Sequence, residues 1–138
     1  MNKVRGYIFS RPFMGERVPQ HVQNLVIRDY CERTGLQYLL SATEYAMADC
    51  HLILEQILDE LVNLHGLVAY SLFQLPDKNQ SREKIYQKII AEKKSFYFAV
   101  EGMTAQTPQD FERIETIWLI RKTLPHCLNL ETLGHDYK

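Results

Sequence analysis

The stretch Leu67-Val68-Ala69-Tyr70-Ser71-Leu72-Phe73 is an almost continuous apolar run that decides the fold class. Gly66 precedes it and Pro76 soon breaks the chain after it. A short apolar run between turn-forming residues predicts a strand that is buried on both faces, which is typical of parallel sheets covered by helices.

Strands and helices alternate on both sides of this run. The apolar patterns predict further strands at residues 4–9, 36–41 and 95–100. They predict helices at residues 19–35, 50–66 and 81–93, and from 107 to about 124. We therefore expect an α/β fold with helices on both faces of a mainly parallel, Rossmann-like sheet of four or slightly more strands.

The length of 138 residues fits one domain. We expect this domain to span residues 1–125, followed by a tail of residues 126–138 that either packs on a partner or frays. No window approaches the roughly 20 consecutive apolar residues of a membrane span, so we expect a cytoplasmic protein without membrane contact.

The charge and the cysteines exclude several classes of protein. The formal net charge of −1 supplies no basic field for nonspecific nucleic-acid binding, which makes a nucleic-acid partner unlikely. Cys31, Cys50 and Cys127 are widely spaced and predict buried reduced thiols rather than disulfides or a zinc site.

A polar segment directly follows the first expected strand, at residues 10–24. It contains two guanidinium groups, a carboxylate, a hydroxyl, an imidazole and three amides, more hydrogen-bonding capacity than a connector needs. Ligands of open α/β sheets bind outside the carboxyl ends of the strands. The expected site takes its side chains from those ends: Ser10, Arg11, Glu16, Arg17, Gln20, Asn24, Glu44, Tyr45, Ser71, Gln74 and Glu101.

Two arginines give this expected site an affinity for anions. Arg11 and Arg17 could grip a carboxylate or phosphate, helped by the free N–H groups where a helix begins at Pro19. The alternative is that both arginines pair with glutamates of the same site. Gln20, Asn24, Ser71 and Gln74 would then read substrate hydroxyls.

Proton transfer would fall to Glu44, with Ser10 or Glu101. Apolar surroundings at a strand end could raise the pKa of Glu44, and the alternative is a solvated loop carboxylate. Ser10 could be a nucleophile, but no G-x-S-x-G elbow surrounds it, so a turn hydroxyl is the alternative.

The sequence predicts neither a metal site nor a cofactor. Its five histidines form no H-E-x-x-H or similar ligand pair. Gly15 stands alone, without the glycine pattern of a dinucleotide site or a P-loop.

The last expected helix carries apolar residues on more than one face. A helix of this kind either contributes to the core or packs against a second subunit, so we expect a homodimer. The apolar residues are Phe111, Ile114, Ile117, Trp118, Ile120 and Leu124.

Two segments resemble a known bacterial family. Residues 6–20, which read GYIFSRPFMGERVPQ, and residues 41–47, which read SATEYAM, resemble the small, sporadically distributed carbohydrate-cluster proteins. The resemblance covers nearly the whole chain. It implies a role in making or modifying an activated sugar for a surface polysaccharide, and it assigns no catalytic residue.

A second resemblance, in the fold, is to the catalytic domain of serine recombinases. In that family a serine follows the first strand in a pattern close to Tyr-x-Arg-Val-Ser, and Ser10 falls at the corresponding place. Ile8 replaces the arginine of that pattern, and residues 72–77, LFQLPD, replace the family's Leu-Asp-Arg-Leu-Gly-Arg. Without these arginines a scissile phosphate lacks charge stabilisation, so DNA strand exchange is not expected.

Three functions remain as hypotheses. The first is a cytoplasmic dimer that binds a sugar phosphate or nucleotide-sugar and either transforms it or assists an enzyme that does. The second is a noncatalytic, recombinase-like dimeric module that assists a polysaccharide enzyme. The third is a nucleic-acid binder, whose affinity would depend strongly on salt.

Overall fold

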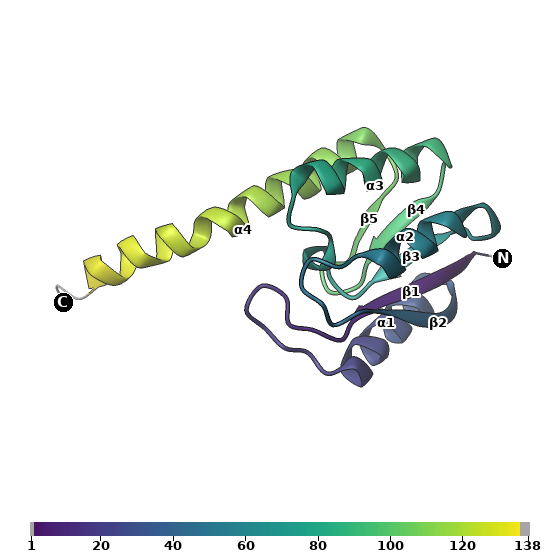
Figure 1. The fold of residues 1–138 in the computed structure, drawn as a ribbon, viewed down its shortest axis with the longest axis horizontal. Coiled ribbons are helices and arrows are strands. Elements are labelled where there is room, and N and C mark those ends of the chain that lie inside the picture. Colours follow the sequence, from purple (N-terminus) through teal and green to yellow (C-terminus); the bar gives the residue numbers. More distant parts are fainter. Residues whose placement is uncertain (1, 136–138) are drawn as a thin grey trace.

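Five strands form one sheet in the order β2-β1-β3-β4-β5 (Figure 1). The computed structural model describes the backbone of residues 2–135 and the side chains of residues 2–123. The first four strands are parallel and β5 is antiparallel to β4. The strands are β1 (Lys3–Phe9), β2 (Gln37–Glu44), β3 (Gly66–Ala69), β4 (Ser95–Phe98) and β5 (Met103–Ala105).

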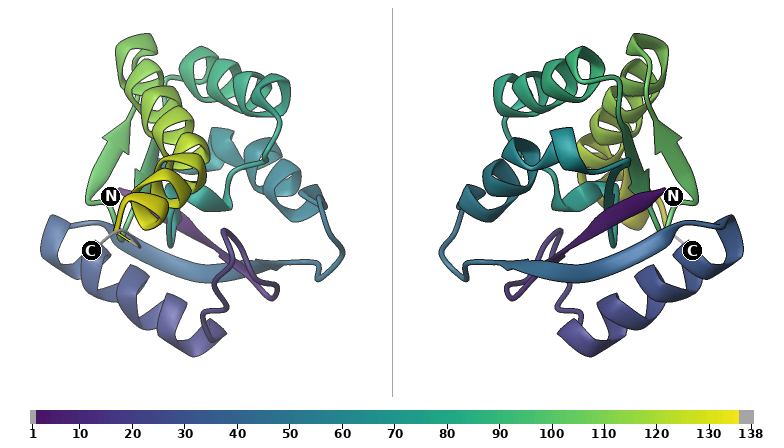
Figure 2. Two further views of the ribbon diagram at one scale, coloured as in Figure 1. Left: turned by 90° about the vertical axis from the view of Figure 1, so that its left-hand side faces the viewer. Right: turned by 90° about the vertical axis from the view of Figure 1, so that its right-hand side faces the viewer.

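Helices cover both faces of this sheet. Figure 2 shows α1 (Gln20–Thr34) on one face, with α2 (Leu52–Asp59), α3 (Asn79–Ala91) and α4 (Pro108–His135) on the other. The core is divided accordingly: Ile27 and Tyr30 of α1 pack with Val68, whereas Leu54 of α2 and Trp118 of α4 belong to a larger cluster. The expected α/β class and the mainly parallel sheet are therefore confirmed.

Two strand predictions were too long and one strand was missed. The third strand ends at Ala69, because residues after it turn into the short helix η2 (Leu72–Gln74). The fourth strand ends at Phe98, and the chain turns back at Gly102 into β5. β5 has only three residues, too few to show an alternating pattern in the sequence.

Gly6 in β1 allows a close approach by β2. The pairing of these strands shifts register between Arg5 and Tyr7. A Cβ atom on Gly6 would lie 2.1 Å from the Ser41 hydroxyl oxygen. A larger residue at this position would therefore displace the Ser41 side chain.

The expected end of the last helix near Leu124 was wrong, because α4 continues to His135. Pro125 removes one backbone donor without ending the helix. The division into a domain of residues 1–125 and a tail stays a prediction, since side chains from residue 124 on, Cys127 included, lie outside the described part. Among the described residues, neither α4 nor any other helix is long and apolar enough to cross a membrane.

A partly buried ion pair joins α4 to α3. Arg82, which is 4% exposed, donates from Nε to Glu115 Oε2 at 2.7 Å and from Nη2 to Oε1 at 2.8 Å. Tyr86 and Asn79 also donate to the Glu115 carboxylate. The guanidinium stacks 4.4 Å from the Trp118 ring centroid, so one side chain joins both helices.

The same pair predicts how stability depends on pH. Burial alone would raise the pKa of Glu115, but hydrogen bonds from Arg82 and Tyr86 outweigh it and hold the pKa below its usual value. The ionised carboxylate therefore stabilises the fold above the usual glutamate pKa, and this contribution is lost as pH falls through the lowered value. Glu115→Gln should cost about 2 kcal/mol at neutral pH and flatten the acid side of the stability curve. Urea unfolding at several pH values measures both effects; an unchanged acid slope would contradict this account.

Candidate functional site

The buried carboxylate of Glu44 binds the start of α2. Its Oε1 atom accepts from the Tyr7 hydroxyl at 2.8 Å and from the Leu54 N–H at 3.2 Å. Its Oε2 atom accepts from the N–H groups of Tyr45 and Ile53, at 3.0 and 3.2 Å. The Cys50 thiol lies 3.6 Å from the same oxygen.

These contacts define what Glu44 can do. The residue is the last of β2 and only 1% exposed, so the alternative of a solvated loop carboxylate was wrong. Burial and the nearby Glu44 carboxylate raise the pKa of Tyr7, which keeps its hydroxyl a donor. Any proton transfer by Glu44 would first have to break these hydrogen bonds.

Ser10 and Arg11 bond to the backbone that follows β2. The Ser10 hydroxyl donates to the Glu44 carbonyl at 2.8 Å, and Arg11 Nη1 donates to the Tyr45 carbonyl at 2.8 Å. The Arg11 guanidinium also lies 4.2 Å from the Phe9 ring centroid, with Nη2 3.4 Å from His51 Nε2. Both side chains therefore help to close the loop after β2 onto the end of β1.

Two fully buried glutamines join β1 to the segment after β3. Gln23 Oε1 accepts from the Phe9 N–H at 3.0 Å and from Gln74 Nε2 at 2.8 Å. Gln23 Nε2 donates to the carbonyls of Phe9 and Val18, both at 2.9 Å. The two side-chain amides thus link the end of β1 to η2, beyond the last residues at which β1 and β3 pair through their backbones.

Ser71 and Glu101 complete this network. The Ser71 hydroxyl donates to Glu101 Oε2 at 2.7 Å, and the Leu72 N–H donates to Oε1 at 3.0 Å. The Ser71 N–H in turn donates to Gln74 Oε1 at 3.3 Å, and the Ser71 oxygen caps η2.

The structure thus brings most of the expected residues to the carboxyl edge, in two groups. Ser10, Arg11, Glu44 and Tyr45 meet beside β2, while Ser71, Gln74 and Glu101 meet beside β3 and β4. Their catalytic and binding roles stay predictions.

Four expected residues do not join either group. Asn24 accepts instead from the Tyr38 hydroxyl at 3.2 Å, and Glu16, Arg17 and Gln20 are exposed. Within the described residues neither Arg11 nor Arg17 forms a salt bridge, so the alternative of pairing with glutamates is not seen in this structure.

Sequence reasoning missed Gln23, Tyr7 and His51. Gln23 lies on the same buried side of its helix as Ile27 and Tyr30. A single amide among apolar residues on such a side predicts a buried side chain that makes hydrogen bonds. His51 carried no such signal, because its place depends on how the loop before α2 folds.

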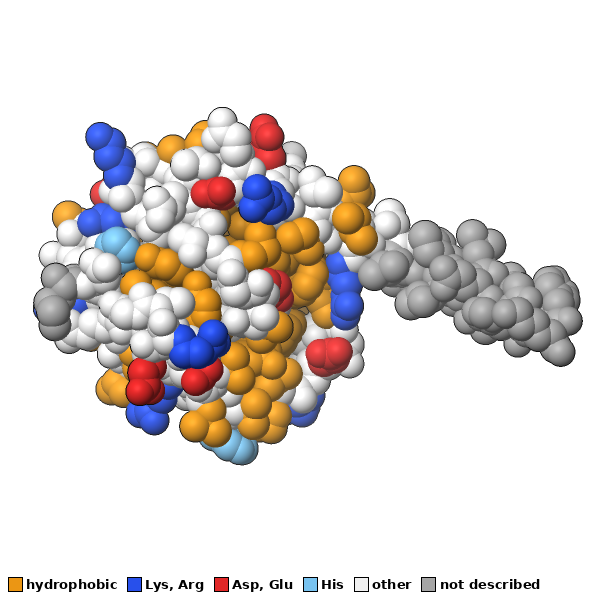
Figure 3. Space-filling model, turned by 180° about the vertical axis from the view of Figure 1, so that it is seen from behind, with side chains coloured by type: hydrophobic (Ala, Val, Ile, Leu, Met, Phe, Trp, Pro, Cys, Tyr) orange, Lys and Arg blue, Asp and Glu red, His pale blue; other side chains and the backbone are white. Residues whose placement is uncertain are grey.

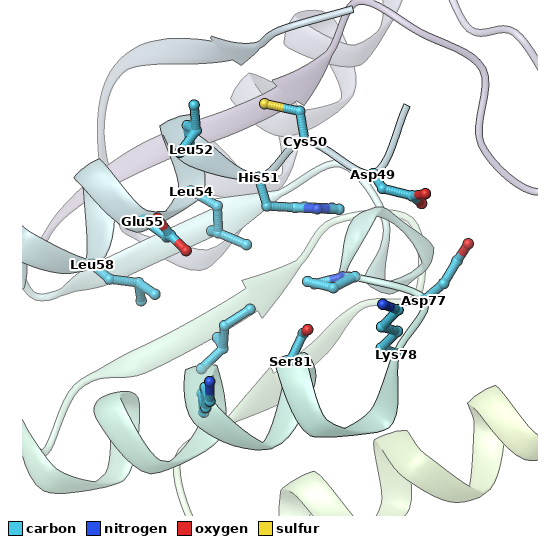
Figure 4. Close-up of a pocket in the computed structure, with 13 residues that line it drawn as sticks. Asp49, Cys50, His51, Leu52, Leu54, Glu55, Leu58, Asp77, Lys78 and Ser81 are labelled. Atoms are coloured by element: carbon cyan, nitrogen blue, oxygen red, sulfur yellow. The ribbon is translucent and has the colours of Figure 1, made fainter. Parts of the chain in front are cut away.

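His51 lines two neighbouring cavities. Burial and the charge of Arg11 lower the pKa of His51, which favours the neutral ring at neutral pH. One cavity, of about 510 Å³, lies between α2 and α3 (Figure 4), and the other, of about 320 Å³, lies under residues 11–14. Among the side chains that the structure describes, no cluster of three His, Cys, Asp or Glu could hold a metal ion.

The positions of the recombinase arginines hold residues of other kinds. Ile8 is buried in the core on the α1 side. Gln74 is tied to Gln23, and Asp77 is exposed. Ser10 therefore follows its strand as in the recombinase pattern, without the cations that accompany it there.

Comparison with solved structures finds the same fold in recombinases. The chain is similar to the N-terminal catalytic domain of TP901-1 integrase, with a TM-score of 0.58 and 15% identity over 90% of this chain and 98% of that one. It is also similar to a resolvase family site-specific recombinase from Streptococcus pneumoniae, with a TM-score of 0.62 and 6% identity over 97% and 98%. At these identities the likeness shows a resolvase-like fold, as the second resemblance implied.

Comparisons of sequence add no family. No protein-family model matches the chain, and no curated protein matches it significantly. The resemblance to the carbohydrate-cluster family therefore has no support from them.

Glu44→Gln tests the structural role of this carboxylate. The amide keeps the shape of the side chain but turns an N–H₂ group toward backbone N–H donors, so we expect a loss of about 3 kcal/mol in unfolding free energy. Urea unfolding measures it, with Glu55→Gln on the exposed side of α2 as the control. A loss no larger than that of the control would contradict the role.

Proposed function

We propose that this chain is a noncatalytic, recombinase-like module that forms a homodimer through α4. The observation that carries the proposal is the bonding of the polar groups at the carboxyl edge of the sheet to one another. A catalytic edge would instead present such groups to a substrate.

The polar groups at this edge have structural partners. The carboxylates of Glu44 and Glu101 both accept hydrogen bonds from backbone N–H groups. The Ser10 hydroxyl donates its hydrogen bond to a backbone carbonyl. Activation of a serine needs a base within hydrogen-bond reach, and stabilising a phosphate needs convergent cations. Ile8, Gln74 and Asp77 supply no such cations, which supports the noncatalytic reading.

The dimer would form through α4. A helix of 28 residues is about 42 Å long, and its second half projects beyond the body (Figure 1). Leu119 and Ile120 are 64% and 53% exposed directly after the buried Trp118. Apolar side chains also gather across the middle of the body and beside the point where α4 leaves it (Figure 3). A second copy would cover this apolar surface.

The sugar-binding hypothesis has less support. Gln74 and Ser71, expected to read hydroxyls, bond to Gln23 and Glu101 instead. A role in assisting a polysaccharide enzyme rests only on the first resemblance, so we retain the module without that partner.

Leu119→Asp and Ile120→Asp test the dimer. Each places a charge on the exposed apolar side of α4, and we expect the dissociation constant to rise at least about tenfold, because removing one buried apolar side chain costs 1.4 kcal/mol or more. Light scattering coupled to gel filtration measures the mass. Leu25→Asp, at a 60% exposed position of α1, is the matched control and should remain dimeric.

Two results would contradict the proposal. A monomeric wild-type protein at micromolar concentration would remove the dimer. Covalent attachment of a DNA strand to wild-type protein, lost in Ser10→Ala, would show that the edge is catalytic.

A further inference from the structure

The smaller of the two cavities is lined mainly by aromatic and aliphatic side chains. Its volume is about 320 Å³ and it lies where β1, the loop before α2 and η2 meet. Its lining residues include Phe9, Phe13, Met14, Phe73 and Leu75. The larger cavity adjoins it, since Asp49, His51 and Asp77 line both (Figure 4).

The rings of this smaller cavity are held in place by neighbours. The Phe13 ring meets Phe9 edge to face at 5.7 Å, and the Phe73 ring meets Trp118 at 5.4 Å. Phe13 and Phe73 both remain half-buried and come from segments far apart in the sequence. Preformed aromatic surfaces of this kind favour a flat aromatic ligand.

Polar groups of complementary kinds line the same cavity. The Arg11 guanidinium is oriented by its Nη1 bond to the Tyr45 carbonyl, by the approach of Nη2 to His51 and by the Phe9 ring, whose centroid lies 4.2 Å from it. Asp49 and Asp77 are exposed carboxylates that can only accept hydrogen bonds when ionised. A ligand that fits must therefore present acceptors on one edge and N–H donors on another.

We propose that the smaller cavity binds the base of a guanine nucleotide. Guanine presents O6 and N7 as acceptors for an arginine, and its N1–H and amino groups as donors for a carboxylate. Its flat rings match the phenylalanine surfaces, and a cavity of this size is at the lower end of the range for small-molecule sites.

The ribose and phosphate would extend into the larger cavity, of about 510 Å³. Ser81 and Lys84 of α3 and Lys78 just before it line this cavity, and its acids are Asp49, Glu55 and Asp77. The acids offset the lysines, so the phosphate adds little and the base supplies the affinity. Guanosine should thus bind nearly as well as its monophosphate.

Isothermal titration with GMP tests this site. We expect GMP and guanosine to bind with similar affinity, AMP at least about tenfold more weakly, and ribose 5-phosphate not at all at millimolar concentration. Phe13→Ala should lower the affinity for GMP about tenfold, because it removes a stacking surface. Arg17→Ala, an exposed arginine of the same segment, is the control and should leave the affinity unchanged.

The result does not depend on the variants alone. On addition of GMP to the wild-type protein, the ring resonances of Phe13, Phe73 and His51 should shift together in NMR spectra. The proposal would be overturned if GMP did not bind, or if AMP or ribose 5-phosphate bound equally well. It would also be overturned if a folded Phe13→Ala variant bound GMP with unchanged affinity. Tighter binding of a guanine-containing single strand than of GMP would also overturn it, by assigning the cavity to a nucleic acid.

Discussion

The carboxylate of Glu44 is the point on which the carboxyl edge of this sheet depends. One buried acid accepts hydrogen bonds from Tyr7 in β1 and from the first turn of α2, at Ile53 and Leu54. A buried charge is tolerated only when it is this fully bonded. The contacts hold the start of α2, next to His51, which lines both neighbouring cavities.

The polar groups at the same edge bond mainly to one another and to the backbone. Recombinase-like topology brings Ser10, Ser71 and Glu101 to the place where parallel strands end. Here these groups satisfy one another and the backbone, and Gln74 bonds to Gln23 where the recombinase pattern has an arginine. These polar side chains stabilise the edge, and the proposed ligand site lies beside it, in the smaller cavity that Arg11 and the aromatic side chains line.

Sequence patterns predicted the α/β alternation because apolar periodicity reports burial directly, as for the run at Leu67 and the stripe of α2. They also placed Glu44, Ser71 and Glu101 at one edge, since parallel strands share their carboxyl ends. They could not tell a bonded carboxylate from a free one, because Tyr7 is distant in sequence and the N–H groups of α2 reach Glu44 only through the fold of the loop between them. β5 and the cavity depend on loop geometry, which leaves no periodic signal.

Amide hydrogen exchange in the wild-type protein tests the central claim most directly. Amides in the first turn of a helix usually exchange fast, because they have no partner within the helix. If Glu44 holds α2, the amides of Ile53 and Leu54 should be protected as strongly as the Phe9 amide, which donates to Gln23. Exchange of Ile53 and Leu54 at unprotected rates, with Phe9 still protected, would contradict the account.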